Sequence, residues 1–385
     1  MQRIPLCMNT SRLGFFNRSI LTRSNALISP YRHVEALSPP QLFKLYGQLS
    51  KSRLTLLVVL TAMSGVALSP LHATVPTLLS TAVGTALCSA SANTLNQLQE
   101  IPFDAQMART RMRPLVRRAI TPLHAAGFAV ATGISGPLML WTMVNPTTAL
   151  LGAANIVLYS GVYTWMKRKT IYNTWVGSIV GALPPLMGWT ACGGQLFPSS
   201  SYPIHLFLPS FIWQFPHFNG LSHLVRASYA QAGYRMLAVL SPRKNSLVAL
   251  RHAVLLVPIC SVLIPLSGLT TWTFALTSLV PNMICTQAAW QFWRIGGEKE
   301  ARLVFRHSLW YLPVVMALMM LHKQGVDWVQ WLGIWDDDQS ELGISNCNFV
   351  SLTDTNINAS ERYSERDRRD RSSALPAQDE KESRI

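Results

Sequence analysis

Acidic side chains are almost absent from the middle of this 385-residue chain. Between positions 36 and 297 there are only two, Glu100 and Asp104. Four long stretches contain no Asp, Glu, Lys or Arg at all; they cover residues 54–99, 119–166, 174–225 and 252–293. A water-soluble domain needs charged side chains distributed over its surface, so this pattern excludes a chain of two or three soluble domains.

The uncharged stretches are long enough to cross a membrane. A helix needs about 20 apolar residues to span the hydrocarbon core, so each stretch has room for two crossings. The stretches do not alternate between polar and apolar residues, which excludes the strands of an outer-membrane barrel. We therefore predict an all-α, polytopic integral membrane bundle of about nine transmembrane helices. The predicted spans are 54–70, 74–95, 121–141, 146–166, 174–193, 203–220, 252–269, 271–292 and 307–325.

Cysteine is also sparse, with six residues that form no Cys-x-x-Cys pair. Most of them fall in or near the predicted spans, where a thiol acts as a small apolar side chain. The pattern predicts neither a disulfide framework nor a zinc site. The net charge of +15 does not indicate nucleic-acid binding, because the basic residues are confined to alternating loops.

The basic loops predict an orientation in the membrane. Loops near residues 71–73, 142–146, 192–203 and 269–271 contain no Lys or Arg, whereas the intervening loops and the amino-terminal segment are basic. All basic loops therefore face one compartment, which in a mitochondrion is the matrix. An odd number of spans would place the carboxyl terminus in the intermembrane space.

The two ends of the chain differ in composition from the apolar middle. Residues 1–40 are rich in Arg, Ser and Thr and have no acidic residue before Glu35, which favours a mitochondrial transit peptide over a disordered basic leader. Residues 50–325 form the predicted transmembrane domain. Residues 336–385 are polar, lack apolar periodicity and are predicted to be a disordered tail.

The two isolated carboxylates belong to one motif. Asn96, Glu100 and Asp104 follow at intervals of one helical turn, and five arginines follow within fourteen residues of Asp104. Carboxylates at a membrane boundary are costly unless something pairs with them. Their oxygens suit a hard cation such as Mg²⁺, and arginines suit phosphate. The motif predicts a site for a metal-bridged diphosphate; the alternative is a salt-bridge cluster that only caps a helix.

Prolines predict interruptions in two helices. Pro102 predicts that the helix carrying the motif ends between Glu100 and Asp104, with Asp104 folding back from the following loop. Pro184 and Pro185 predict a kink or break within the fifth span, with carbonyl groups left unpaired.

The residues around the motif resemble a known family. The run Ser91-Ala-Asn-Thr-Leu-Asn96, with Glu100, Pro102-Phe-Asp104 and Arg113-Pro-Leu115, is similar to the first aspartate-rich motif of the mitochondrial protoheme IX farnesyltransferases, or haem O synthases. These enzymes are the haem-modifying branch of the UbiA prenyltransferase superfamily. The resemblance covers roughly residues 50–325. It continues at Tyr163-Thr-Trp-Met-Lys167-Arg168, Asn173-Thr-Trp-Val-Gly177, Gly181-Ala-Leu-Pro-Pro185-Leu-Met-Gly188-Trp189, Trp213-Gln-Phe-Pro-His217-Phe-Asn219 and Tyr229-Ala-Gln-Ala-Gly233-Tyr-Arg-Met236.

The resemblance implies a reaction and a set of catalytic residues. The farnesyl group of farnesyl diphosphate would be transferred to a vinyl group of protoheme IX, giving haem O for haem A synthesis and cytochrome c oxidase assembly. Mg²⁺ would be held by the oxygens of Asn96, Glu100 and Asp104. The cations that would neutralise the diphosphate are Arg109, Arg113, Lys167 and Arg168.

The same resemblance implies that Tyr163, His217 and Asn219 contact the substrates. Two of these functional interpretations have structural alternatives. Lys167 and Arg168 are also explained as positive-inside anchors of the fourth span. His217, near the end of the sixth span, is also explained as a polar helix cap.

The resemblance further implies a location and partners. The enzyme would lie in the mitochondrial inner membrane, in contact with its lipid, with the active-site loops facing the matrix. Its protein partners would include haem A synthase or other factors of cytochrome c oxidase assembly.

One departure from the family pattern leaves the function open. Ser228 stands where an acidic residue is expected before Tyr229, and a hydroxyl is a poor ligand for Mg²⁺. A weaker second site, completion of the site by Asn219, or a non-catalytic haem carrier would each accommodate it. Two further alternatives are an aromatic prenyltransferase of quinone synthesis, which the run Trp213-Gln-Phe-Pro-His217-Phe-Asn219 argues against, and a secondary transporter. The transporter is disfavoured because the acidic pair lies at a membrane face among arginines rather than at the midplane.

Overall fold

The computed structural model describes residues 38–71, 73–196 and 202–325, all within one compact unit, Met1–Val326. The predicted disordered tail and all but the last residues of the predicted leader lie outside these ranges. The described residues are almost entirely helical. The helices are α2 (Pro39–Leu49), α3 (Ser52–Leu68), α4 (Val75–Asp104), α5 (Pro122–Met143), α6 (Pro146–Ile156), η2 (Val157–Tyr163), α7 (Thr164–Met166), α8 (Asn173–Ala191), α9 (Tyr202–Leu224), α10 (Arg226–Gln231), α11 (Leu237–Leu240), α12 (Pro242–Pro258), η3 (Ile259–Leu263), α13 (Ile264–Leu266), α14 (Trp272–Ile295) and α15 (Glu298–Leu321).

Several helices begin with the same local device, a polar cap followed by proline. The side chains of Thr74, Thr121 and Asn145 each accept a hydrogen bond from the backbone N–H three residues later, at the starts of α4, α5 and α6. A proline follows within two positions in each case, where its missing N–H costs nothing. These caps explain why the helices begin where the sequence shows a short proline-containing turn.

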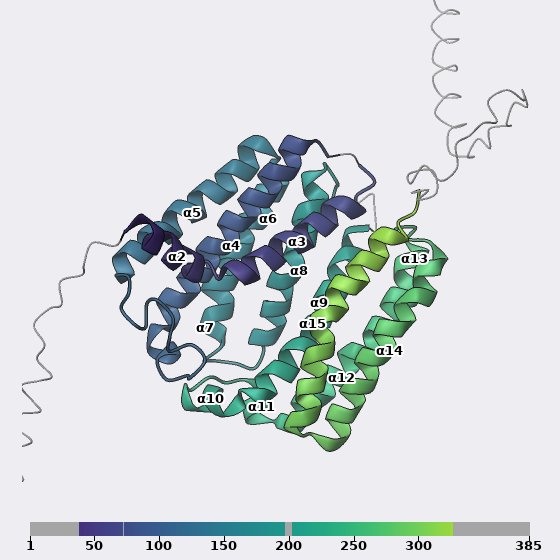
Figure 1. The fold of residues 1–385 in the computed structure, drawn as a ribbon. Coiled ribbons are helices and arrows are strands. Elements are labelled where there is room, and N and C mark those ends of the chain that lie inside the picture. The colour runs from purple at the N-terminus through teal and green to yellow at the C-terminus, as the bar shows by residue number, and fades with distance from the viewer. Residues whose placement is uncertain (1–37, 72, 197–201, 326–385) are drawn as a thin grey trace, which may run out of the picture. The chain divides into compact units, whose positions relative to one another are not determined.

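The long helices pack together as one bundle (Figure 1). Successive neighbours around the bundle are α3, α4, α5, α6, α8, α9, α12, α14 and α15, and α15 returns to pack against α3. The segments α10 and α11 lie together at one end of the bundle. The largest apolar cluster lies between α9, α12, α14 and α15 and includes the fully buried Phe274, Phe292 and Tyr311.

The membrane fold agrees with the sequence prediction, while the count of nine spans is not confirmed. Five helical segments are long and apolar enough to cross a membrane: Val75–Asp104, Pro122–Met143, Pro146–Met166, Pro242–Leu266 and Glu298–Leu321. A sixth is obtained if α2 and α3, which meet at 59°, form one bent span. The helices α8, α9 and α14 also overlap predicted spans but do not meet this hydropathy criterion.

The helix is not broken at Pro184 and Pro185, since α8 runs as one helix from Asn173 to Ala191, and the alternative of a kink stays a prediction. The backbone of α8 lies directly against α3. A Cβ atom on Gly188 would collide with the carbonyl oxygen of Ala62, and one on Gly65 would collide with the carbonyl oxygen of Pro185. The prolines therefore stand in a helix that is supported by close backbone packing.

Candidate active site

The last turns of α4 carry the predicted metal ligands. Asn96, Glu100 and Asp104 are all buried, with relative exposures of 1, 4 and 1%. They follow at four-residue intervals on one face of the helix. The predicted fold-back of Asp104 from a loop is wrong, because α4 continues through Pro102 and Asp104 is its last residue. A proline one turn from a helix end interrupts only one hydrogen bond there, which explains why the helix tolerates it.

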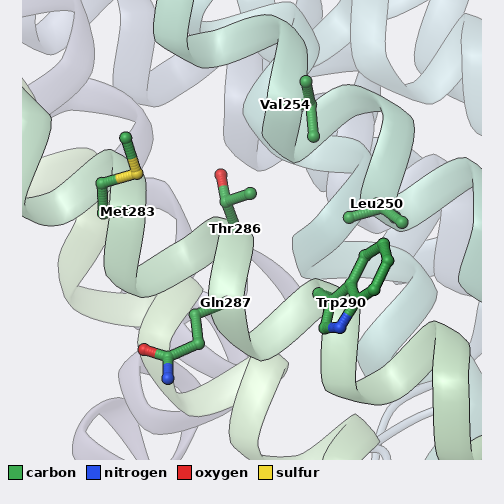
Figure 2. Close-up of a pocket in the computed structure, with 6 residues that line it drawn as sticks. All are labelled: Leu250, Val254, Met283, Thr286, Gln287 and Trp290. Atoms are coloured by element: carbon green, nitrogen blue, oxygen red, sulfur yellow. The ribbon is translucent and has the colours of Figure 1, made fainter.

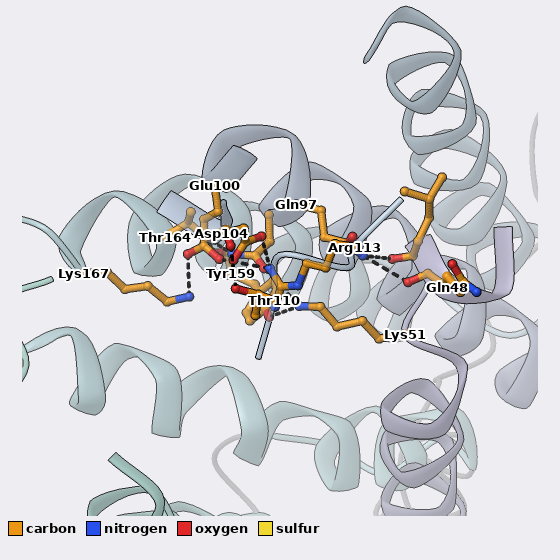
Figure 3. Close-up of polar contacts among 12 residues, drawn as sticks. Gln48, Lys51, Gln97, Glu100, Asp104, Thr110, Arg113, Tyr159, Thr164 and Lys167 are labelled. Carbon is orange, nitrogen blue, oxygen red and sulfur yellow. Dashed lines mark hydrogen bonds and ion pairs between the residues drawn. The ribbon is translucent and has the colours of Figure 1, made fainter. Parts of the chain in front are cut away.

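Two basic side chains pair with the carboxylates (Figure 3). The ammonium of Lys167 lies 2.6 Å from Glu100 Oε1. The guanidinium of Arg113 donates to Asp104 Oδ2 and lies 3.6 Å from Glu100 Oε2. Charge-assisted hydrogen bonds of this kind offset the cost of burying the carboxylates.

A third cation comes from the junction of α2 and α3. Lys51 Nζ donates to Asn96 Oδ1 at 3.0 Å and to the hydroxyl of Tyr159 at 3.3 Å. Asn96 in turn donates through Nδ2 to Thr164 Oγ1 at 3.0 Å. Lysines from two distant segments and an arginine from the loop after α4 therefore meet at one end of α4.

The π-helix η2 and the short α7 form the wall opposite α4. Tyr159 and Tyr163 stack with ring centroids 5.4 Å apart, and Lys167 Nζ lies 4.6 Å from the ring centre of Tyr163. Burial acts to lower the pKa of the Lys167 ammonium, but the oxygens of Tyr163 and Glu100 beside it outweigh burial and raise the pKa well above its usual value. Lys167 is therefore a cation at neutral pH.

The segment around α10 and α11 contacts Lys167. Arg235 N donates to the carbonyl of Lys167 at 2.9 Å, and the ring of Tyr234 lies 6.0 Å from Lys167 Nζ. Tyr234 packs edge-on against Tyr229 within an apolar cluster that includes Met107. Burial, followed by the nearby Glu100 carboxylate, raises the pKa of Tyr234, so its phenol is a neutral hydroxyl.

Ser228 is half-buried on α10, next to Tyr229. It lies six residues before Tyr234, on the segment that brings this tyrosine near Lys167.

One acceptor in the centre has no protein donor. Asp104 Oδ1 is buried and has no hydrogen-bond partner, although Oδ2 of the same carboxylate is paired with Arg113. A buried anionic oxygen without a partner is costly, so such an atom points to a ligand. The carboxylate of Glu100 and the amide oxygen of Asn96 lie on the same helix face as Asp104. Together the three side chains offer oxygen ligands that fit a hard cation.

Four predicted site residues lie outside the cluster of Asn96, Glu100, Asp104 and their basic partners. Arg109 is exposed beyond α4, and Arg168 is exposed with its guanidinium 4.7 Å from the ring centre of Phe103. Asn219 and Asn245 exchange side chain-to-backbone hydrogen bonds at 3.3 and 3.0 Å, which tie α9 to α12. The structure therefore gives Asn219 a packing contact and leaves the two arginines at the surface.

The fourth, His217, belongs to a separate polar contact between α9 and α15. Its Nδ1 lies 2.9 Å from Ser308 Oγ, and its ring stacks on Trp213 with centroids 4.7 Å apart. Because the Ser308 hydroxyl donates to the carbonyl of Phe305 at 2.7 Å, its oxygen accepts from His217 Nδ1–H. Nε2 is then the nitrogen that carries the lone pair.

Three residues of the centre were missed by sequence reasoning: Lys51, Tyr159 and Thr164. Lys51 lies three residues before the predicted span 54–70, where a basic residue is expected as a membrane anchor. Tyr159 and Thr164 lie within an apolar stretch without a charged neighbour. The one usable signal was their helical spacing from Tyr163 and Lys167, which places all four residues along one side of a helix.

Residues 58–310 match the UbiA prenyltransferase family. The chain belongs to this family. Among curated members of it, the mitochondrial protoheme IX farnesyltransferase of Neurospora crassa is 44% identical over 325 residues, which cover 77% of this chain and 63% of that protein. The corresponding protein of Yarrowia lipolytica is 45% identical over 315 residues, covering 78% and 66%. This chain thus spans slightly less than two thirds of the length of these two relatives.

Solved structures share the UbiA fold with this chain. A digeranylgeranylglyceryl phosphate synthase aligns over 73% of this chain and 98% of its own, with a TM-score of 0.61 and 16% identity. A UbiA homolog from Archaeoglobus fulgidus, bound to DMAPP and Mg²⁺, aligns over 71% of this chain and 98% of its own, with a TM-score of 0.51 and 15% identity. These likenesses establish the UbiA fold.

Proposed function

We propose that this protein transfers the farnesyl group of farnesyl diphosphate to a vinyl group of protoheme IX, giving haem O. The observation that carries the proposal is the buried pair of carboxylates, Glu100 and Asp104, which Arg113 and Lys167 neutralise, with Lys51 on the neighbouring Asn96. The identity of the two substrates is supported by the 44–45% identical relatives, which are named protoheme IX farnesyltransferases.

The residues at the end of α4 fit a magnesium ion bound together with a diphosphate. Glu100, Asp104 and Asn96 would hold the metal, and the unpartnered Asp104 Oδ1 is an available ligand atom. When bound, Mg²⁺ supplies positive charge to the departing diphosphate oxygens. A protein of the same fold has been solved with DMAPP and Mg²⁺, which supports this ligand class.

The basic side chains have two successive tasks in this proposal. Before substrate binds, Lys167 and Arg113 neutralise the buried carboxylates. With diphosphate bound, the same cations donate to its oxygens, because the negative charge is then larger on the substrate. Preorganised cations stabilise charge that develops on a leaving group, so Lys167, Arg113 and Lys51 favour departure of diphosphate.

The apolar walls govern the fate of the farnesyl group. As the carbon–oxygen bond to diphosphate breaks, positive charge develops on the allylic carbon. The rings of Tyr159 and Tyr163 lie on the wall facing α4, where their faces favour a nearby cation and their bulk excludes water. The vinyl group of protoheme then attacks this carbon, and a water molecule supplies the hydroxyl group of the hydroxyethylfarnesyl product while releasing a proton.

On the haem side, we propose that His217 contacts protoheme through Nε2. The hydrogen bond from Nδ1 to Ser308 holds the ring and leaves the Nε2 lone pair available to a metal or a proton donor. Arg109 and Arg168 would contribute to the positive surface that attracts the diphosphate and the haem propionates.

The proposed setting is the mitochondrial inner membrane, with the active-site loops on the matrix side. The relatives' names include a mitochondrial location, and the described helices include at least five candidate spans. Haem A synthase and cytochrome c oxidase assembly factors are the proposed downstream partners, since they would use the product.

Direct product analysis tests the proposal. The full chain, purified and reconstituted in phospholipid, is incubated with protoheme, farnesyl diphosphate and Mg²⁺, and the haem fraction is analysed by mass spectrometry. We expect a farnesylated, hydrated haem with the wild-type protein and with Glu298→Gln, which alters an exposed acid. We expect Asp104→Asn to lose at least about a hundredfold in rate, because a metal ligand and an ion pair are removed together. Absence of prenylated haem with correctly folded wild-type protein would refute the proposed function.

A further inference from the structure

An open apolar groove of about 480 Å³ lies between α12 and α14, away from the carboxylate centre (Figure 2). It is lined by Leu250 and Val254 from α12 and by Met283, Thr286, Gln287 and Trp290 from α14. Val254, Met283 and Trp290 are about half exposed, so the groove opens outward from the bundle. Because α12 belongs to the candidate span Pro242–Leu266, this outer surface faces lipid.

The turns of α12 and α14 beyond the groove lead to the basic end of both helices. Thr286 Oγ1 donates to the carbonyl of Ala253 at 3.2 Å, which fixes the level at which the two antiparallel helices meet. On α14, Met283, Trp290 and Arg294 follow at helical spacing along one face. Because the two helices are antiparallel, the start of α12 at Pro242 and the end of α14 at Ile295 lie at the same end of the groove. We call this end the mouth of the groove.

Three arginines lie on the turns that lead from the groove to that mouth. Arg294 lies one turn beyond Trp290, Arg251 lies one turn before Val254, and Arg243 stands at the start of α12. All three are exposed, and none takes part in an ion pair within the described ranges. Arg251 stands about 12 Å along the helix from Arg243, and its long side chain can bring its charge toward the membrane surface.

The groove also contains one amide side chain, Gln287, which needs a hydrogen-bond partner. Gln287 is exposed on the lipid-facing side of α14, and the described residues give its amide no hydrogen-bond partner. An amide facing hydrocarbon is costly unless a ligand supplies a donor or acceptor. Trp290 and Trp293, whose ring centroids are 5.2 Å apart, stand between this amide and Arg294, at the position that tryptophans favour in the membrane interface.

We propose that this groove is a binding site for an anionic glycerophospholipid. The acyl chain lies against Leu250, Val254 and Met283, the ester carbonyls accept from Gln287, and the phosphate lies between Arg251 and Arg294. A neutral lipid would cover the apolar groove but leave the arginines without a negative partner. A soluble anion would pair with the arginines but leave the groove uncovered. An anionic lipid does both.

Lipid retention by the full chain tests this site. Protein purified in a neutral detergent is titrated with phosphatidylglycerol or phosphatidylcholine, and bound lipids are counted by native mass spectrometry. The double variant Arg251→Gln/Arg294→Gln removes the proposed headgroup contacts. The control Arg302→Gln/Arg306→Gln removes two exposed charges from α15, which does not line the groove. In a separate variant, Val254→Trp fills the groove without altering charge.

The proposal predicts preferential retention of phosphatidylglycerol by the wild type and the control. Its affinity should fall about tenfold or more in the double variant and in Val254→Trp, with helical content and thermal stability kept. Equal retention of phosphatidylcholine, or an equal loss in the control, would overturn it in favour of general attraction to the basic surface. Displacement of phosphatidylglycerol by soluble glycerol phosphate with no effect of Val254→Trp would indicate an anion site instead. A dimer lost on groove filling would indicate a second copy as the occupant.

Discussion

Lys51 stands in the left-handed region of backbone conformation, with a φ of 50°, between α2 and α3. This conformation costs a non-glycine residue about 1–2 kcal/mol. The sharp junction directs the side chain inward, where its ammonium holds Asn96 and Tyr159. Backbone strain and a half-buried basic group at the same residue are characteristic of functional sites.

Substituting Lys51 separates its backbone role from its charge. Lys51→Gly should preserve the left-handed turn and the stability of the protein, because glycine adopts this conformation without strain. We expect the same variant to lower kcat/KM for farnesyl diphosphate about ten- to a hundredfold, since charge-assisted hydrogen bonds contribute about 1.5–3 kcal/mol. Lys51→Arg should recover part of the activity. Wild-type kinetics in Lys51→Gly would show that the ammonium has no part in substrate binding.

Among the site residues, the sequence identified charged residues that are isolated within apolar sequence and missed residues without this feature. Glu100 and Asp104 were recognisable because no other carboxylate occurs for many residues on either side. In the structure Arg113 and Lys167 pair with these carboxylates, whereas Arg109 and Arg168 are exposed, and the role of all four toward a diphosphate stays a prediction. Neighbouring arginines in a loop look equivalent in sequence, and only the path of the loop decides which one reaches the carboxylates.

The helices α3 and α8 meet closely enough to exclude side chains. Gly188 and Gly65 provide the space for this contact, and the carbonyls of Ala62 and Pro185 occupy it. Membrane helices gain stability from such close approach, because lipid removes the hydrophobic driving force for their association.

Gly188→Ala should therefore destabilise the fold by about 1–3 kcal/mol, as is typical of overpacking. Thermal unfolding in detergent, followed by circular dichroism, measures the effect. Gly127→Ala on α5 is the matched control, since a Cβ there meets nothing within 4 Å. The control should unfold at the wild-type temperature or slightly above, because alanine favours helix more than glycine does. Equal unfolding temperatures for both variants would mean that the two helices can separate without cost.

Helix identity was predictable from the sequence, but helix ends and continuity were not. Each predicted span overlaps a long helix, yet α4 extends through Pro102 to Asp104 and α8 continues through Pro184 and Pro185. Proline rules describe the local loss of a hydrogen bond. They do not include the surrounding helices, which hold the chain in place.

For the whole molecule, the distribution of basic loops predicts the orientation in the membrane. Tags inserted near residues 110 and 240 should both be protected in intact mitoplasts, because their loops are basic and should face the matrix. A tag after residue 340 should be digested by added protease, since the predicted nine spans would place it on the other side. Equal protection of the tags near 110 and after 340 would contradict the odd span count.

The whole account depends on Glu100 and Asp104 binding a metal-bound diphosphate. Equilibrium binding of farnesyl diphosphate to the reconstituted chain, with and without Mg²⁺, measures this directly. We predict Mg²⁺-dependent binding by the wild type that falls at least about a hundredfold in Asp104→Ala, while Glu298→Ala binds normally. If Asp104→Ala, shown to be folded, bound farnesyl diphosphate with the wild-type affinity and Mg²⁺ dependence, the carboxylates would be structural and the proposed active site would be wrong.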